Sequence, residues 1–303
     1  MSGIKGISIG RQGAVWPYHV VALVTSLVWS TTFVSTKVLL MSGMTPETIF
    51  VTRFAVAYLL ICLISRGPLL ARNWRDEGLL ALAGITGGSL YFLTENTALE
   101  YTYASNVSIL ISAAPLMTIA LTSAVFRQPM RRNMLLGAVI ALAGVTLVVL
   151  NGSTDVHISP VGDLLTLAAA FCWAAYSVIL KAVGSGRYSV VFVTRKVFFY
   201  GLVTMIIYMF CAGIHYDFSL LTKPLVYGNL IYLSVFASLV CFIVWNKVMD
   251  VIGPDKANNY IYLSPVGTIT TAVIVLGEPL SWMAVVGALV IVAGVFIAEK
   301  SWK

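Results

Sequence analysis

The sequence has few charged residues, and this scarcity excludes a water-soluble globular domain. Asp, Glu, Lys and Arg make up 10% of the 303 residues, hydrophobic residues make up 59%, and the mean hydropathy is +0.92. Soluble domains usually carry about 25% charged residues. Apolar runs of about 20 residues recur along the whole chain, and each is long enough to cross the hydrocarbon core of a bilayer. The sequence therefore predicts an integral membrane protein.

The chain also lacks the clustered nucleophiles and metal ligands that an enzyme needs. Its four cysteines lie inside apolar runs, with neither metal-ligand spacing nor the pattern of a disulfide framework. The three histidines are scattered, and no Walker, HExxH or GxSxG motif occurs. We therefore expect no enzyme, no catalytic residue, no metal and no cofactor. A membrane-embedded enzyme that modifies lipids is the alternative, but it would require clustered His, Asp or Ser side chains.

Ten apolar spans follow a polar tail at residues 1–15. Closed β-barrels are excluded, because the spans do not alternate in ten-residue strands. Helices satisfy their own backbone groups in lipid, so the predicted fold is an all-α integral membrane protein with ten transmembrane helices. The expected spans are 16–40, 46–65, 78–99, 104–126, 133–151, 160–182, 190–213, 225–248, 255–276 and 281–299.

The second half of the chain repeats the first with a shift of 150 residues. From 96 to 145, 12 of 50 positions match the residue 150 places later, where composition alone would give about four. The expected units are a first five-helix repeat at 16–151, a second at 152–299, and a terminal tail at 300–303. An odd number of spans per copy inverts the second repeat relative to the first, which is typical of secondary transporters.

Lysine and arginine gather in the loops on one side of the expected bundle. The opposite loops, near 41–47, 100–103, 152–159, 214–224 and 277–280, contain only Lys223. This asymmetry predicts that both termini lie in the cytoplasm, and we expect the protein to lie in the cell (inner) membrane. It also explains the net charge of +7 without any nucleic-acid partner. The basic side carries the N-terminal tail, Arg66, Arg72, Arg75, Arg127, Arg131, Arg132, Arg187, Lys247, Lys256, Lys300 and Lys303.

Proline and glycine mark matching positions in the two repeats. Pro115 and Pro265 lie near the middle of spans 4 and 9, where each frees backbone carbonyls at membrane depth. They are candidate hinges, although a simple helix kink is an equal alternative. Four glycines with seven-residue spacing in spans 5 and 10 predict close helix packing, either within the chain or in a homodimer. They are Gly137, Gly144, Gly287 and Gly294.

Three charged residues lie deep inside apolar spans. Arg53 and Arg195 are each about 10 Å from a helix end, so one of them could bind a substrate carboxylate or both could be structural. Glu95 has no evident local partner and could carry a coupling proton or act structurally near the outer interface. Its counterpart in the second repeat is Trp245, so the second half does not share this role.

Polar and aromatic side chains crowd the same spans, and they suit a neutral or zwitterionic organic solute. Asn258 and Asn259 would be unfavourable facing lipid, so a cavity or a helix contact is expected there. Interfacial packing is the alternative for many of the aromatic residues. The candidate substrate-binding residues are Trp29, Arg53, Tyr91, Asn96, Ser108, Trp173, Tyr176, Trp245, Asn246, Asn258, Asn259 and Tyr262.

The order of these features over residues 16–299 resembles the EamA-type branch of the drug/metabolite transporter superfamily. The first-half residues that carry the resemblance are Trp29 to Val34, Arg53-Phe54, Asn96 to Leu99, Ala104 to Asn106 and Pro115. Those of the second half are Trp173 to Tyr176, Ser264-Pro265 and Gly277 to Pro279, followed by a glycine-rich last helix. The resemblance implies a ten-helix carrier that exports amino acids or related metabolites, with a cavity between spans 1, 3, 4, 6, 8 and 9.

One motif departs from that family pattern. The Gly-Glu turn is present as Gly277-Glu278 but reads Arg127-Gln128 in the first copy. A symmetric role for this glutamate is therefore not expected, and we assign Glu278 a structural role at a helix turn.

Taken together, these features predict a secondary-active exporter of amino acids or similar small metabolites that works by alternating access. A proton-independent facilitator is the nearest alternative. A purely structural membrane protein would leave Arg53, Glu95, Asn258 and Asn259 without a purpose. The expected partners are a small-molecule substrate and the lipid bilayer, with a homodimer as a further option.

Overall fold

The computed structural model describes residues 15–65, 67–127, 132–151, 159–279 and 282–299, and these residues contain helices but no strand. The predicted all-α class is therefore confirmed. The helices are α1 (Trp16–Met41), α2 (Pro46–Ile64), α3 (Trp74–Gly84), η2 (Ile85–Leu90), α4 (Tyr91–Tyr101), α5 (Ala104–Ile111), α6 (Ala114–Val125), α7 (Arg132–Asn151), α8 (Pro160–Val183), α9 (Val190–Ala212), η3 (Phe218–Thr222), α10 (Pro224–Ile231), η4 (Tyr232–Val240), α11 (Cys241–Ile252), α12 (Pro254–Asn258), η5 (Asn259–Leu263), α13 (Ser264–Leu276) and α14 (Trp282–Glu299).

Seven helical segments of the described chain are long and apolar enough to cross a membrane, so the protein is a multi-pass membrane protein. The expected spans 78–99, 133–151 and 281–299 also form helices, but length and hydropathy alone do not identify these as spans. The qualifying segments are Trp16–Met41, Pro46–Ile64, Ala104–Val125, Pro160–Val183, Val190–Ala212, Pro224–Ile252 and Pro254–Leu276.

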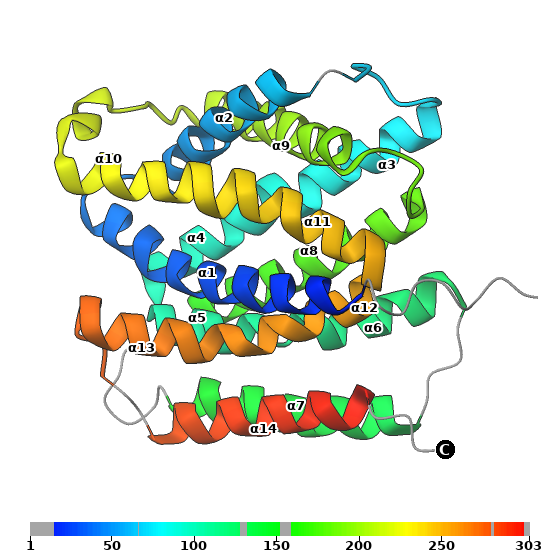
Figure 1. The fold of residues 1–303 in the computed structure, drawn as a ribbon. Coiled ribbons are helices and arrows are strands. Elements are labelled where there is room, and N and C mark those ends of the chain that lie inside the picture. Colours follow the sequence, from blue (N-terminus) through cyan, green and yellow to red (C-terminus); the bar gives the residue numbers. More distant parts are fainter. Residues whose placement is uncertain (1–14, 66, 128–131, 152–158, 280–281, 300–303) are drawn as a thin grey trace, which may run out of the picture.

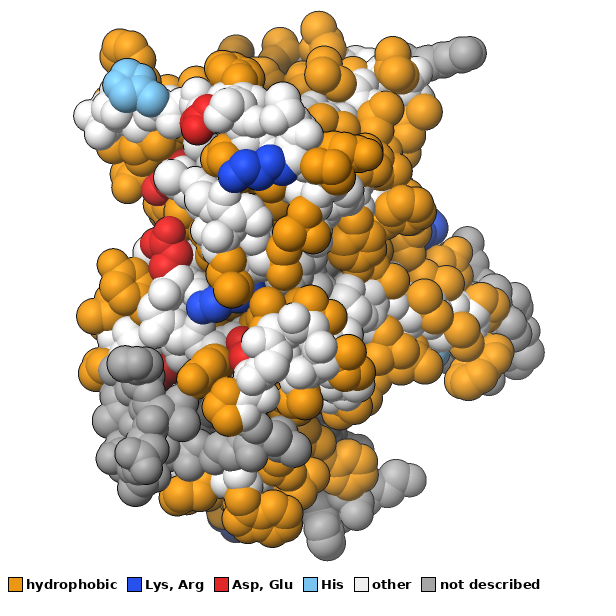
Figure 2. Space-filling model, turned by 90° about the vertical axis from the view of Figure 1, so that its left-hand side faces the viewer, with side chains coloured by type: hydrophobic (Ala, Val, Ile, Leu, Met, Phe, Trp, Pro, Cys, Tyr) orange, Lys and Arg blue, Asp and Glu red, His pale blue; other side chains and the backbone are white. Residues whose placement is uncertain are grey.

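The surface has the polarity expected of a bundle in lipid. Figure 2 looks onto one end of the bundle, where charged side chains gather in a strip and hydrophobic side chains cover the right-hand flank. Large apolar side chains point outward from the helices, and the Phe210 and Trp282 side chains are 87% and 78% exposed. In water such exposed apolar surface would promote association, whereas hydrocarbon solvates it.

α7 and α14 lie side by side along one edge of the bundle (Figure 1). A Cβ atom added to Gly144 would come within 2.7 Å of Ile291, and one added to Gly294 would come within 2.5 Å of the Ala141 backbone nitrogen. The predicted close helix packing at these glycines is thus confirmed. Because this packing joins two helices of the same chain, it assigns no surface to the homodimer that the sequence left as an option.

Both central prolines lie where a helical span is interrupted. Pro115 is in the first turn of α6, which follows the end of α5 at Ile111. Pro265 is in the first turn of α13, directly after the 3₁₀ segment η5. Proline cannot donate a backbone hydrogen bond and clashes with the preceding turn, so the break precedes each ring. This confirms the interruption that the sequence predicts; the hinge role remains a prediction.

Two π-helical segments occupy matching places in the two halves, and no feature of the sequence predicted them. η2 leads into α4, and η4 leads into α11. Gly87 of η2 lies against Tyr176 of α8, where a Cβ would meet the Tyr176 ring at 2.4 Å. Such widened turns are frequent at functional sites, because they reorient the side chains that follow. Here Tyr91 and Phe92, which follow η2, and Phe242, which follows η4, line a cavity in the centre of the bundle.

Contacts between the two halves hold the bundle together. α2 packs on α9, α4 packs on α8, and α1 packs on both α11 and α13. The buried Lys196 side chain of α9 forms an ion pair with Glu77 of α3, which also accepts a hydrogen bond from Tyr200. The two halves therefore pack against each other through several pairs of helices.

The α7–α14 contact generates a stability prediction. Gly294→Ala should lower the free energy of unfolding by about 1–3 kcal/mol, since the added methyl group overpacks a tight helix crossing. Gly228→Ala is the matched control, because a Cβ added to this exposed residue of α10 would have no atom within 4 Å. Thermal unfolding in detergent should show a clear loss for the first variant only. Equal melting curves for the two variants would contradict the tight crossing.

Candidate functional site

A central chamber lies between α1, α2, α4, α8 and α11, beside the broken segment before Pro265. Its volume is about 40 Å³, measured as space for the centres of water molecules, which corresponds to about three waters. An organic solute therefore requires the helices to move apart. The lining residues are Trp29, Thr32, Phe33, Arg53, Tyr91, Phe92, Glu95, Ile111, Trp173, Phe242, Ile261 and Ser264.

Aromatic rings form much of the chamber wall. Trp29 and Trp173 make an edge-to-face contact with their ring centroids 5.4 Å apart, and Phe242 lies 5.6 Å from Trp29. Trp245 packs behind Trp29 at 4.9 Å. The indole nitrogen of Trp29 donates a hydrogen bond to the Ala237 carbonyl (2.9 Å), which belongs to the π segment η4. This bond fixes one face of the chamber.

Arg53 reaches the same chamber from α2. Its side chain is buried, and its Nε donates a hydrogen bond to Ser238 Oγ of η4 at 2.9 Å. The guanidinium carbon lies 4.6 Å from the centroid of the Phe92 ring, close enough for a cation–π contact. The π segment η4 thus holds both Trp29 and Arg53.

Glu95 faces the chamber from α4, one turn after Tyr91. Its carboxylate is buried, and Oε2 has no hydrogen-bond partner among the described residues. No salt bridge joins it to Arg53, although both residues line the same cavity. A buried carboxylate without a partner is unfavourable, so this residue has the environment of a functional group.

A layer of hydrogen bonds closes one side of the chamber. Asn258 accepts from Trp173 Nε1 (3.2 Å) and donates to Thr118 (2.9 Å) and Ser177 (3.0 Å). Beside it, Tyr176 donates to Asn246 (2.6 Å). Asn246 in turn donates to Thr194 of α9 (2.8 Å). These side chains separate the chamber from the next cavity and leave Asn258 fully satisfied.

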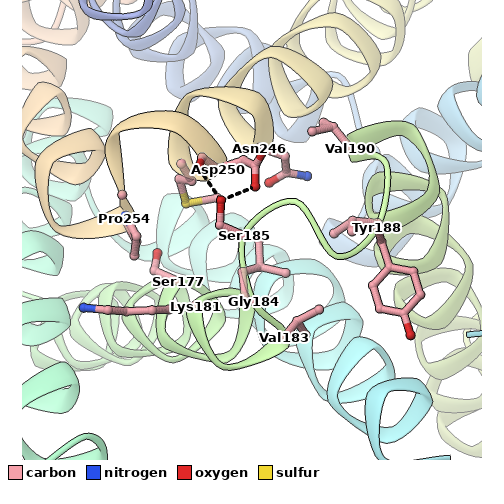
Figure 3. Close-up of a pocket in the computed structure, with 14 residues that line it drawn as sticks. Ser177, Lys181, Val183, Gly184, Ser185, Tyr188, Val190, Asn246, Asp250 and Pro254 are labelled. Carbon is pink, nitrogen blue, oxygen red and sulfur yellow. Dashed lines mark hydrogen bonds between the residues drawn. The ribbon is translucent and has the colours of Figure 1, made fainter. Parts of the chain in front are cut away.

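Beyond that layer lies a second cavity, the Asp250 pocket, with a volume of about 230 Å³. Asp250 accepts hydrogen bonds from Ser185 Oγ and from the Gly186 backbone nitrogen, both at 2.7 Å. Figure 3 shows the Ser185–Asp250 bond above the pocket and the Lys181 side chain pointing away from it. Asn246 lines this pocket while bonding to Tyr176, so it belongs to the partition between the two cavities.

A third cavity, the Lys37 pocket, lies beside the C-terminal end of α1, near Met41, and has a volume of about 530 Å³. Lys37 donates to the Leu99 carbonyl and to the Thr102 carbonyl (3.0 Å), both at the end of α4. Glu278 accepts from the backbone nitrogens of Ala104 (2.7 Å) and Ser105 (3.1 Å), which caps the start of α5. The structural role that the sequence predicts for Glu278 is confirmed.

Several predicted site residues lie outside the chamber. Asn96 donates to the Pro46 carbonyl (3.2 Å), and Ser108 donates to the Ser105 carbonyl (2.8 Å). Asn259 and Tyr262 lie on η5 but do not line the cavity. Arg195 donates to Ser65 (2.8 Å) and to the Pro68 carbonyl, which ties α9 to the end of α2. Of the two deep arginines, the chamber therefore contains only Arg53.

The chamber also includes residues that the sequence reasoning missed. They are mostly apolar and none is charged, and the motifs that contain Thr32, Phe33 and Ser264 carried the family resemblance without marking these residues as part of a site. One signal was present, because Phe242 is the counterpart of Phe92 at a shift of 150 residues. The missed lining residues are Thr32, Phe33, Phe92, Ile111, Phe242, Ile261 and Ser264.

Comparison with known proteins gives one consistent match. Residues 16–150 and 160–299 each match the EamA-like transporter family. An uncharacterized transporter of Archaeoglobus fulgidus is 28% identical over 92% of this chain and 96% of its own length. A probable amino-acid metabolite efflux pump of Salmonella typhimurium is 28% identical over 91% and 92%. A probable terminal-alkyne amino-acid exporter of Streptantibioticus cattleyicolor is 26% identical over 95% and 93%.

A solved crystal structure shares the fold. It superimposes with a TM-score of 0.66 at 17% identity and covers 94% of this chain and 97% of its own.

The hydrogen-bonded layer predicts that two adjacent asparagines differ sharply. Asn258→Ala should destabilise the protein by about 1–3 kcal/mol, because it leaves buried partners of Asn258 unsatisfied. Asn259→Ala is the control and should change stability little, since Asn259 Oδ1 has no hydrogen-bond partner among the described residues. Thermal unfolding of both purified variants checks the difference. A larger loss for Asn259→Ala would refute the assigned layer.

Proposed function

Because the chain belongs to the EamA-like transporter family, we propose that it is a secondary-active exporter of amino acids or related small metabolites. The observation that carries this proposal is the central chamber, where a buried arginine and an unpaired buried carboxylate meet aromatic walls in a membrane bundle. Two relatives named for amino-acid export support the substrate class. The named relatives are transporters and offer no support for a lipid-modifying enzyme.

The proposed topology has ten transmembrane helices in two inverted five-helix repeats, 16–151 and 152–299. Both termini lie in the cytoplasm of a cell whose inner membrane holds the protein. With this orientation the Asp250 pocket faces the cytoplasm and the Lys37 pocket faces outward, on either side of the chamber. Solute would then enter through the first pocket and leave through the second.

Alternating access requires the helices around the chamber to separate on one side at a time. Pro115 and Pro265 are the proposed pliant points, since both follow breaks in the hydrogen-bond ladder. The interleaved contacts of α2 with α9 and of α4 with α8 mean that the moving bodies combine helices of both repeats. The layer of Tyr176, Asn246 and Asn258 is placed to close the cytoplasmic side.

Glu95 is the proposed carrier of the coupling proton, since its Oε2 lacks a partner among the described residues. In liposomes that contain the purified protein, a labelled amino-acid pool should accumulate only under an imposed pH gradient. Glu95→Gln should abolish gradient-driven accumulation, because the amide cannot exchange a proton. Asp217→Asn is the control, as Asp217 lies in a loop and bonds only locally to Ser219.

Accumulation that persists unchanged in Glu95→Gln would remove the coupling role. Equilibration of the pool without any dependence on the gradient would identify a facilitator instead. If folded protein moves no solute above empty liposomes, the amino-acid assignment is wrong.

A further inference from the structure

The two charges in the central chamber are opposite in sign and attract each other, but no salt bridge joins them. Arg53 forms one hydrogen bond with the described residues, from Nε to Ser238. The two terminal nitrogens of its guanidinium take no part in this bond and are available to a ligand. Glu95 lines the same cavity, and its Oε2 is buried without a hydrogen-bond partner among the described residues. Both side chains are at least 97% buried, with exposures of 2% and 3%. A buried charge is stable only when a partner satisfies it. A ligand reaches both charges once the helices around the chamber have moved apart, as any organic solute requires.

We propose that Arg53 and Glu95 together bind the zwitterionic head of an α-amino acid. Arg53 receives the carboxylate and Glu95 receives the ammonium group. This inference rests on the proposed transport function and assigns the substrate chemistry of that same chamber. Glu95 holds the ammonium group in one state of the transport cycle and the proton in another.

The geometry of Arg53 favours a carboxylate ligand. A guanidinium binds a carboxylate through two parallel N–H donors. The bond from Nε to Ser238 and the contact with the Phe92 face fix the plane of the guanidinium and leave the outer edge of the fork for the ligand.

Solutes with a different charge pattern fit less well. An amine would leave Arg53 without a partner, and a hydroxy acid would do the same to Glu95. A neutral solute would leave both charges unsatisfied.

The rest of the chamber selects an uncharged side chain. Among the described residues that line it, only Arg53 and Glu95 carry a charge. Trp29, Trp173 and Ile261 offer apolar contact for the remainder of the solute. A lysine or glutamate side chain would bring a further charge into this wall without a partner. Neutral amino acids, both aliphatic and aromatic, are therefore the expected class.

Binding can be measured separately from transport. The chain has seven tryptophans, and Trp29 and Trp173 line the chamber, so ligand binding should change the intrinsic fluorescence. The purified protein is titrated with L-alanine, L-leucine and L-phenylalanine. It is then titrated with two truncated probes. The first, 3-methylbutylamine, lacks the carboxylate of leucine. The second, 2-hydroxy-4-methylpentanoate, lacks the ammonium group of leucine.

Wild type should bind at least one of the amino acids, and leucine at least about 30-fold more tightly than either truncated probe, as expected for losing a buried charge contact. Arg53→Gln should bind leucine and the amine about equally. Glu95→Gln should bind leucine and the hydroxy acid about equally. Arg53→Lys keeps the charge and should retain part of the preference for leucine over the amine. Melting curves establish that each variant is folded.

Three results would overturn the clamp: no response of wild type to any amino acid, equal binding of leucine and its truncated forms, or equal losses for all probes in both variants. Selective binding without movement of solute in liposomes would instead uphold the clamp and reject the transport proposal.

Discussion

Hydrocarbon cannot hydrogen-bond, and this one constraint organises the whole structure. Every polar group inside a membrane-spanning helix needs a partner within the protein. Most of them have one: Asn258 bonds to three side chains, and Asn246 bonds to two. Glu95 differs, because its Oε2 is buried without a hydrogen-bond partner among the described residues and the residue lines the chamber. In the proposed carrier, the partner of Glu95 is the solute or a proton.

Backbone irregularities are concentrated around the chamber for the same reason. The breaks before Pro115 and Pro265 and the π segments η2 and η4 all lie next to residues that line the chamber. η4 shows the use of such a segment, since it supplies the Ala237 carbonyl to Trp29 and the Ser238 hydroxyl to Arg53. A regular helix presents its carbonyls along its own axis. A widened turn can offer groups sideways, where they orient the residues of a site.

The fold could be predicted from the sequence because membrane helices are recognisable by length and hydropathy, and the helix breaks followed from proline chemistry. Only some of the residues that line the chamber could be predicted in this way. Arg53 and Glu95 stood out, since a charge in lipid demands an explanation. Ile111 did not, because an apolar residue in an apolar span looks like any packing residue until the helices are assembled. Asn96 shows the opposite failure, since its partner is the Pro46 carbonyl and only the structure reveals that.

The two repeats share one architecture, but the chamber is asymmetric, and this asymmetry affects how a solute would be oriented. Both chamber charges come from the first half, Arg53 from α2 and Glu95 from α4, whereas the second half contributes Trp173, Phe242 and Ile261. At the position equivalent to Glu95, the second half has a tryptophan. A zwitterion in the chamber would therefore direct its charged head to the first half, while apolar side chains of both halves would surround the rest of the solute. Repetition supplies matched helix breaks and π segments in the two halves, and divergence within that frame gives the chamber its two charges.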